Sequence, residues 1–134
     1  MNLEKIFKFI EDKTNYKTPI TYKIINGLPL TNDELIVDGN LFLLYINITT
    51  LPDNLKVGGF LNLTGTKILS LPDNLKVGGS LTLSFTKITS LPDNLKVGGD
   101  LILSHTPLSK YHTGKQIKKM IEDKGGTIKG KIYI

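Results

Sequence analysis

Few residues of this 134-residue chain are of the types that catalyse reactions at neutral pH. The chain has no cysteine, which excludes disulfides, thiolate metal sites and a cysteine nucleophile. Its two histidines, His105 and His112, flank an expected turn, and no nucleophile or third metal ligand accompanies them in the sequence. We therefore expect no enzyme activity, no metal site and no cofactor.

One motif partly fits a phosphate-binding loop. Gly125, Gly130 and Lys131 have the G-x-x-x-x-G-K spacing of such a loop. The next residue is Ile132, where a phosphate-binding loop has the Ser or Thr that contacts Mg²⁺. We therefore do not expect a nucleotide site.

Charge is the remaining chemical signal. All 17 basic residues are lysines, against 12 acidic residues, so the chain lacks the arginines that usually make bidentate phosphate contacts and read guanine. Residues 111–134 hold six lysines and two acids. Five of these lysines are candidate contacts for an anion or a nucleic acid: Lys115, Lys118, Lys119, Lys129 and Lys131. A solvated helix face is the simpler explanation.

A repeat dominates the sequence and must position these side chains. The block L-P-D-N-L-K-V-G-G occurs unchanged at residues 51–59, 71–79 and 91–99. Each copy precedes an alternating stretch with a leucine pair, as in Leu61 and Leu63. Alternation predicts one short strand per repeat with its leucines in a shared core. The constant interval between the copies predicts parallel strands in stacked coils.

The constant spacing also assigns the other repeat positions. Pro52 and its copies fix φ and favour an extended or turn-like back to each coil. The Gly58-Gly59 pair supplies positive φ or tightly packed backbone where the chain bends into the strand. Asp53 and Lys56 recur at the same positions of the next two repeats, and the two resulting rows suggest a calcium or anion site. Ordinary solvated turn residues are the simpler interpretation.

Different elements are expected at the two ends. A helix over residues 2–13 would cap the N-terminal end, and residues 20–24 alternate like a first strand. A helix over residues 113–124, with Thr113 as N-cap, precedes a final strand over residues 127–134. We expect one domain over residues 1–134, with an N-terminal helical cap (1–19), a repeat solenoid (20–110) and a C-terminal helix-strand cap (111–134).

The run Leu81-x-Leu83-x-x-Thr86-x-Ile88-x-x-Leu91-Pro92-x-x-Leu95 resembles the leucine-rich repeat in its short bacterial form, and the resemblance covers roughly residues 28–110. The block is also similar to small repeat proteins of bacteria and their phages. Two columns depart from the pattern: Thr66, Thr86 and Thr106 replace Asn, and Gly58, Gly78 and Gly98 replace the leucine that opens the strand.

The resemblance implies an α/β solenoid, an arc with a parallel sheet of about six strands whose exposed face recognises proteins. Alternation and the rim beyond the strands give the candidate partner-binding residues: Phe42, Leu44, Phe60, Asn62, Thr82, Ser84, Phe85, Asp100, Ile102 and His105. The alternative for Phe42 and Phe60 is that neighbouring elements cover them, or that they are scattered exposed residues.

The leading functional hypothesis is a non-catalytic protein-binding module, and the phage-like repeats suggest an inhibitor of a host or defence protein. Nucleic-acid binding through the C-terminal lysines is the second hypothesis, and a structural, self-associating protein is the third. No run approaches the length of a membrane span, so we expect a cytoplasmic protein of a bacterium or phage-infected cell. It would be monomeric or weakly self-associating, with an unidentified protein partner and no membrane contact.

Overall fold

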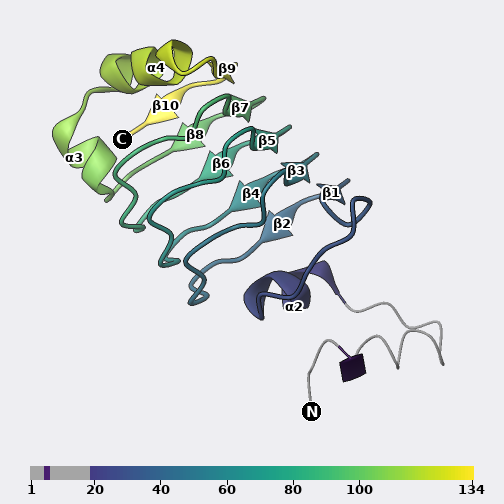
Figure 1. Cartoon of the computed structure of the whole chain (residues 1–134). Coiled ribbons are helices and arrows are strands. Elements are labelled where there is room, and N and C mark those ends of the chain that lie inside the picture. The colour runs from purple at the N-terminus through teal and green to yellow at the C-terminus, as the bar shows by residue number, and fades with distance from the viewer. Residues whose placement is uncertain (1–4, 7–18) are drawn as a thin grey trace.

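The computed structural model describes residues 5–6 and 19–134, and its repeats form a parallel β-solenoid (Figure 1). Within the described residues, ten two-residue strands form two sheets. Sheet A contains β1 (Ile36–Val37), β3 (Lys56–Val57), β5 (Lys76–Val77), β7 (Lys96–Val97) and β9 (Thr127–Ile128). Sheet B contains β2 (Leu41–Phe42), β4 (Leu61–Asn62), β6 (Leu81–Thr82), β8 (Leu101–Ile102) and β10 (Ile132–Tyr133).

The strand register follows the sequence period. Leu61 pairs with Leu81 and Leu81 with Leu101, so identical residues of successive coils stack on one another. Sheet B turns leucines inward and sheet A turns valines inward, which confirms the predicted core. The fully buried large side chains include Leu43, Leu55, Leu61, Leu63, Ile68, Leu75, Leu81, Leu83, Ile88, Leu95, Leu101 and Leu103. Burial of these ladders is the main stabilising contribution to the fold.

The single six-stranded sheet predicted from the sequence is wrong in strand count, because each coil also pairs at the L-K-V-G-G segment. Lys56 N–H donates to Leu35 O and Gly58 N–H to Val37 O, at 2.8 and 2.7 Å. The predicted strand over residues 20–24 is also wrong, since helix α2 (Ile20–Ile25) lies there. Ile20 and Ile24 fit a helical spacing of four as well as a strand alternation, and Ile24 is buried against the core.

The C-terminal end has more helix than predicted. Helix α3 (Pro107–Tyr111) begins at Thr106, and α4 (Gly114–Asp123) begins at the predicted cap Thr113, whose hydroxyl accepts the Gln116 N–H. α4 buries Ile117 and Ile121 and packs on β9 and β10. The predicted strand over residues 127–134 divides into these two strands, so the segment extends both sheets by one coil.

Glycine at the corner between the two sheets allows successive coils to approach closely. A Cβ on Gly58 would lie 2.6 Å from Asp38 O, and a Cβ on Gly78 would lie 3.0 Å from the carbonyl carbon of Gly58 and still closer to its oxygen. The first described coil has Asp38 at this position. The glycine column that departs from the leucine-rich pattern is therefore required by backbone packing between coils.

Gly78→Ala should lower the free energy of unfolding by about 2 kcal/mol, because the added methyl group forces the backbones of two coils apart. Chemical denaturation measures the change. Gly39→Ala is the control, since its Cβ would meet no atom within 4 Å. Equal stability of the two variants would contradict the packing argument.

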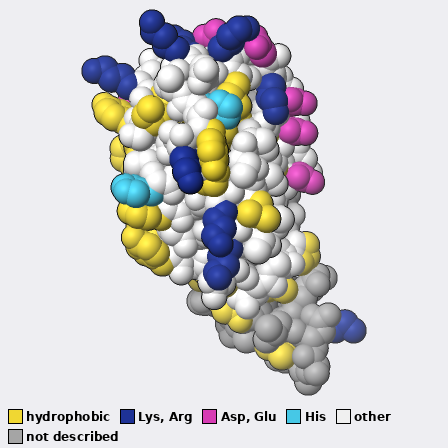
Figure 2. Space-filling model, turned by 90° about the vertical axis from the view of Figure 1, so that its left-hand side faces the viewer, with side chains coloured by type: hydrophobic (Ala, Val, Ile, Leu, Met, Phe, Trp, Pro, Cys, Tyr) yellow, Lys and Arg dark blue, Asp and Glu magenta, His cyan; other side chains and the backbone are white. Residues whose placement is uncertain are grey.

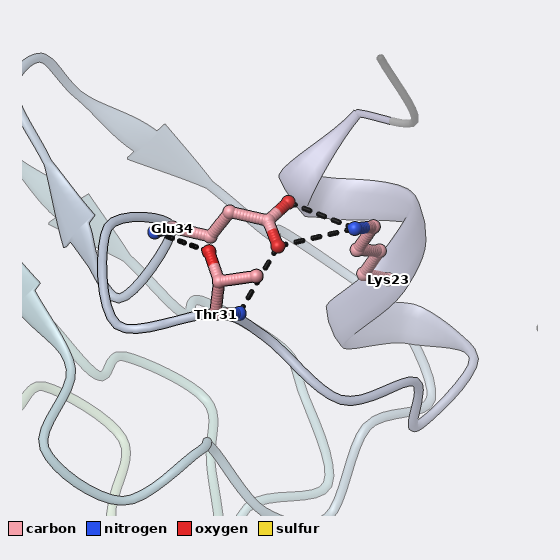
Figure 3. A network of polar contacts seen from close by, with 3 residues as sticks. All are labelled: Lys23, Thr31 and Glu34. Carbon is pink, nitrogen blue, oxygen red and sulfur yellow. Dashed lines mark hydrogen bonds and ion pairs between the residues drawn. The ribbon is translucent and has the colours of Figure 1, made fainter. Parts of the chain in front are cut away.

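At the N-terminal end, a polar network connects α2 to the first coil (Figure 3). Lys23 Nζ lies 2.9 Å from Glu34 Oε2, and Glu34 Oε1 accepts the Thr31 N–H at 3.1 Å. Partial burial by itself raises the pKa of Glu34, but the Lys23 and Thr31 hydrogen bonds and the Lys23 charge outweigh it, so the pKa lies below its usual range. The predicted helix over residues 2–13 lies outside the described residues, apart from residues 5–6.

Glu34→Gln should destabilise the fold by about 1 kcal/mol at neutral pH, since it removes the charge that Lys23 and Thr31 stabilise. Because the folded-state pKa is lowered, the carboxylate stabilises the native state above the ordinary pKa of 4.5, and this stabilisation is lost as the pH falls through the lowered value. Denaturation of both proteins across this range should show their difference disappear in acid. A constant difference would contradict the assignment.

Candidate interaction surface

The outer face of sheet B is apolar at its N-terminal end. Phe42 in β2 is 54% exposed and Phe60, just before β4, is 51% exposed. Leu44 is also exposed. The described residues around them therefore leave these side chains accessible, although a water-facing strand position usually carries a polar residue.

The middle of the same face is more polar and partly buried. Asn62, Thr82, Asp100 and Ile102 are half-buried. Asn62 Oδ1 accepts both the N–H and the hydroxyl of Thr64, and Asp100 Oδ1 accepts the Lys131 N–H at 2.8 Å. Two of the predicted contact residues therefore also stabilise the coils.

Ser84 departs from the predicted exposed face. Its side chain is 7% exposed, and its hydroxyl lies 2.9 Å from that of Ser104 in the next coil. The small hydroxyl side chains of two adjacent coils satisfy each other here, so Ser84 is a packing residue in this structure and presents little surface.

A column of exposed side chains follows sheet B. Tyr45, Gly65, Phe85 and His105 occupy equivalent positions of four coils and all have positive φ, between 56° and 70°. The Phe85 and His105 rings stack with their centroids 4.4 Å apart and their planes inclined by 8°. Tyr45 lies over Gly65, where a Cβ would collide with its ring. The turn thus directs three rings outward from one edge of the solenoid.

The threonine that follows this column stabilises the turn. The hydroxyls of Thr66, Thr86 and Thr106 donate to the carbonyl oxygens three residues earlier, at 2.8, 2.7 and 2.6 Å. All three threonines are buried. Their single hydroxyl therefore satisfies the backbone where the leucine-rich pattern has asparagine.

The sequence predicts a final strand over residues 127–134, but it does not place Tyr133 on the outer face of sheet B. Tyr133 pairs with Ile102 and is 48% exposed, so it adds an aromatic side chain to the same surface. Ile134 beside it is exposed too. The alternation of residues 127–134 was a usable signal, but the register that aligns Ile132 with Leu101 depends on the intervening helices.

The five candidate anion-binding lysines are all exposed. Lys115, Lys118 and Lys119 belong to α4, whereas Lys129 and Lys131 lie between β9 and β10. Lys119 forms an ion pair with Asp123 at 3.1 Å, across one turn of the helix. This pair neutralises part of the charge on the helix.

The repeated Asp and Lys columns are exposed, as predicted. Asp73 Oδ1 accepts the Asp93 N–H, and Asn74 Oδ1 accepts from Asn94 Nδ2, both at 2.9 Å. The aspartates beside Pro52 and Pro72 border an open groove of about 510 Å³. Within residues 5–6 and 19–134, no three His, Asp or Glu side chains are grouped as metal ligands would be.

Comparisons of the chain with protein-family models, curated proteins and solved structures give no significant match. Among the helices described by the structure, none combines the length and the apolar character needed to cross a membrane. The strand pairing defines the class of protein: a stacked parallel β-solenoid in which each coil repeats the register of the one before.

Proposed function

We propose that this solenoid is a non-catalytic binding module that contacts a protein partner through the outer face of sheet B. The observation that carries the proposal is the exposure of large apolar side chains on that face, namely Phe42, Leu44, Phe60 and Tyr133. Exposed aromatic and aliphatic groups of this kind are enriched at protein interfaces and supply much of their binding energy.

The framework beneath these side chains favours binding. Hydrogen bonds connect each coil to the next, as between Leu41 N–H and Phe60 O and between Leu61 N–H and Ser80 O, at 2.8 and 3.0 Å. The buried side chains of Leu41, Leu61, Leu81 and Leu101 fix the inner face of β2, β4, β6 and β8. A partner would therefore meet a preorganised surface and would not have to order it on binding.

A more specific assignment rests on the sequence pattern. The chain is proposed to be a short leucine-rich-repeat protein, since the spacing of its leucines and prolines agrees with that pattern and its coils stack in parallel. Phage-like repeats motivate the further hypothesis that the partner is a host or defence protein which the chain inhibits. Protection of phage in a panel of defence-carrying hosts tests that role separately.

Replacing Phe42 and Phe60 together by serine should abolish recovery of a partner by the tagged protein from its native host. The double variant should keep its free energy of unfolding within about 1 kcal/mol, since both side chains are half exposed and lie outside the core. Quantitative mass spectrometry of the purified complexes measures the loss.

Leu69→Ser is the matched control, because Leu69 is an exposed large hydrophobic residue, 58% accessible, that lies outside sheet B. It should leave partner recovery unchanged. Recovery that persists in the phenylalanine double variant, or is lost equally in the Leu69 variant, would contradict binding through sheet B.

A further inference from the structure

On a second surface of the solenoid, the charged side chains are all lysines. We define the turn edge as residues 44–50, 64–70, 84–90 and 104–110, the segments that follow sheet B in four coils. These segments contain three lysines, Lys67, Lys87 and Lys110, and no aspartate or glutamate. Figure 2, viewed from the side of these loops, shows lysines in a column on this face, with acidic side chains along the right-hand margin and at the top of the molecule.

Exposed rings accompany the lysines on the turn edge. Tyr45 and Phe85 are 70% and 56% accessible, and His105 is exposed and stacked on Phe85. Lys67 lies two residues after Gly65, and Lys87 lies two residues after Phe85. Both lysines are exposed as well. Parallel pairing sets the coil spacing at about 4.8 Å, so rings and ammonium groups form two parallel rows.

We propose that the turn edge binds single-stranded nucleic acid, with bases stacked on Tyr45 and on the faces of Phe85 and His105 that do not stack on each other, and with phosphates beside Lys67 and Lys87. Flat aromatic faces next to a row of cations are the combination that single-strand binders use. Stacking accepts any base, and lysine contacts phosphate as a point charge. The binding is therefore independent of base sequence, which agrees with a chain that has no arginine.

This site is separate from the one proposed on sheet B. Phe42 and Phe60 belong to sheet B and its approach, whereas the rings of the turn edge project from turns with positive φ. Phe85 and His105 already cover one face of each other. An acidic peptide would satisfy the lysines but would leave the remaining ring faces without planar partners. The rings thus favour nucleic acid over an acidic protein segment.

Fluorescence anisotropy with labelled oligo-dT and oligo-rU of about 12 nucleotides tests the proposal. With two phosphates contacted, the affinity should fall roughly sevenfold when salt rises from about 50 to about 200 mM, since each contact to a single strand adds about 0.7 to the logarithmic slope. Absence of binding to either oligonucleotide at the lower salt concentration would overturn the proposal.

Two double variants locate the site. Tyr45→Asn with Phe85→Asn removes two of the three rings but keeps a residue that tolerates positive φ, and it should weaken binding at least about thirtyfold. Lys67→Gln with Lys87→Gln should weaken binding and flatten its salt dependence. The matched control is Lys56→Gln with Lys76→Gln, which makes the same charge change on sheet A and should leave the affinity within about twofold.

Three outcomes contradict the assignment. The Lys67/Lys87 and Lys56/Lys76 double variants could reduce the affinity equally, which would indicate a general charge effect. The asparagine variant could bind normally while circular dichroism shows a native fold. A poly-glutamate peptide could compete as well as the oligonucleotide. Phe42→Ser with Phe60→Ser should retain oligonucleotide binding, so failure of the sheet B proposal and failure of this one are distinguishable.

Discussion

Close approach of successive coils at the Gly-Gly corner is the constraint on which the rest of this solenoid depends. The backbones of Gly58 and Gly78 meet with no room for a side chain between them. This contact allows the chain to leave sheet A and enter sheet B within three residues, and hydrogen bonds on both sides of the corner hold the coils in register. Leucine ladders of uniform depth can form only because every repeat turns at the same place.

The two proposed surfaces depend on different local geometries, a strand in one case and a turn in the other. The outer face of sheet B presents residues by strand alternation, so each coil contributes a predictable side chain at positions such as Phe42 and Asn62. The turn edge presents residues through a positive φ, which projects Tyr45 and Phe85 away from the core. A buried threonine, Thr66, Thr86 or Thr106, stabilises this turn from within in three of the four coils.

Much of the fold was predictable from the sequence, because the constant repeat period and the alternation of leucines such as Leu61 and Leu63 define the stacking and the buried face. Sheet A was not predictable in the same way, since a two-residue strand such as Lys56–Val57 is too short to show alternation. The region of α2 is ambiguous in sequence because Ile20 and Ile24 suit both periods.

The candidate surfaces were predictable only in part. Alternation identifies the outward positions, and Phe42 and Phe60 are accessible there. Burial of Ser84 depends on its contact with Ser104 in the next coil, and the alignment of Tyr133 with Ile102 depends on two helices between them. Both are properties of three-dimensional packing, which the alternation of residues along one strand does not specify.

The unchanged nine-residue block has a consequence for how such a protein can vary in size. Because the blocks at residues 51–59, 71–79 and 91–99 are identical, one more unit of the repeat inserted among them would meet its neighbours through contacts that already exist. Each inserted unit would lengthen both exposed surfaces by about 4.8 Å. Positions such as Phe60, Asn62 and Gly65 differ between units, so the length of this protein and the chemistry of its surface can change independently of each other.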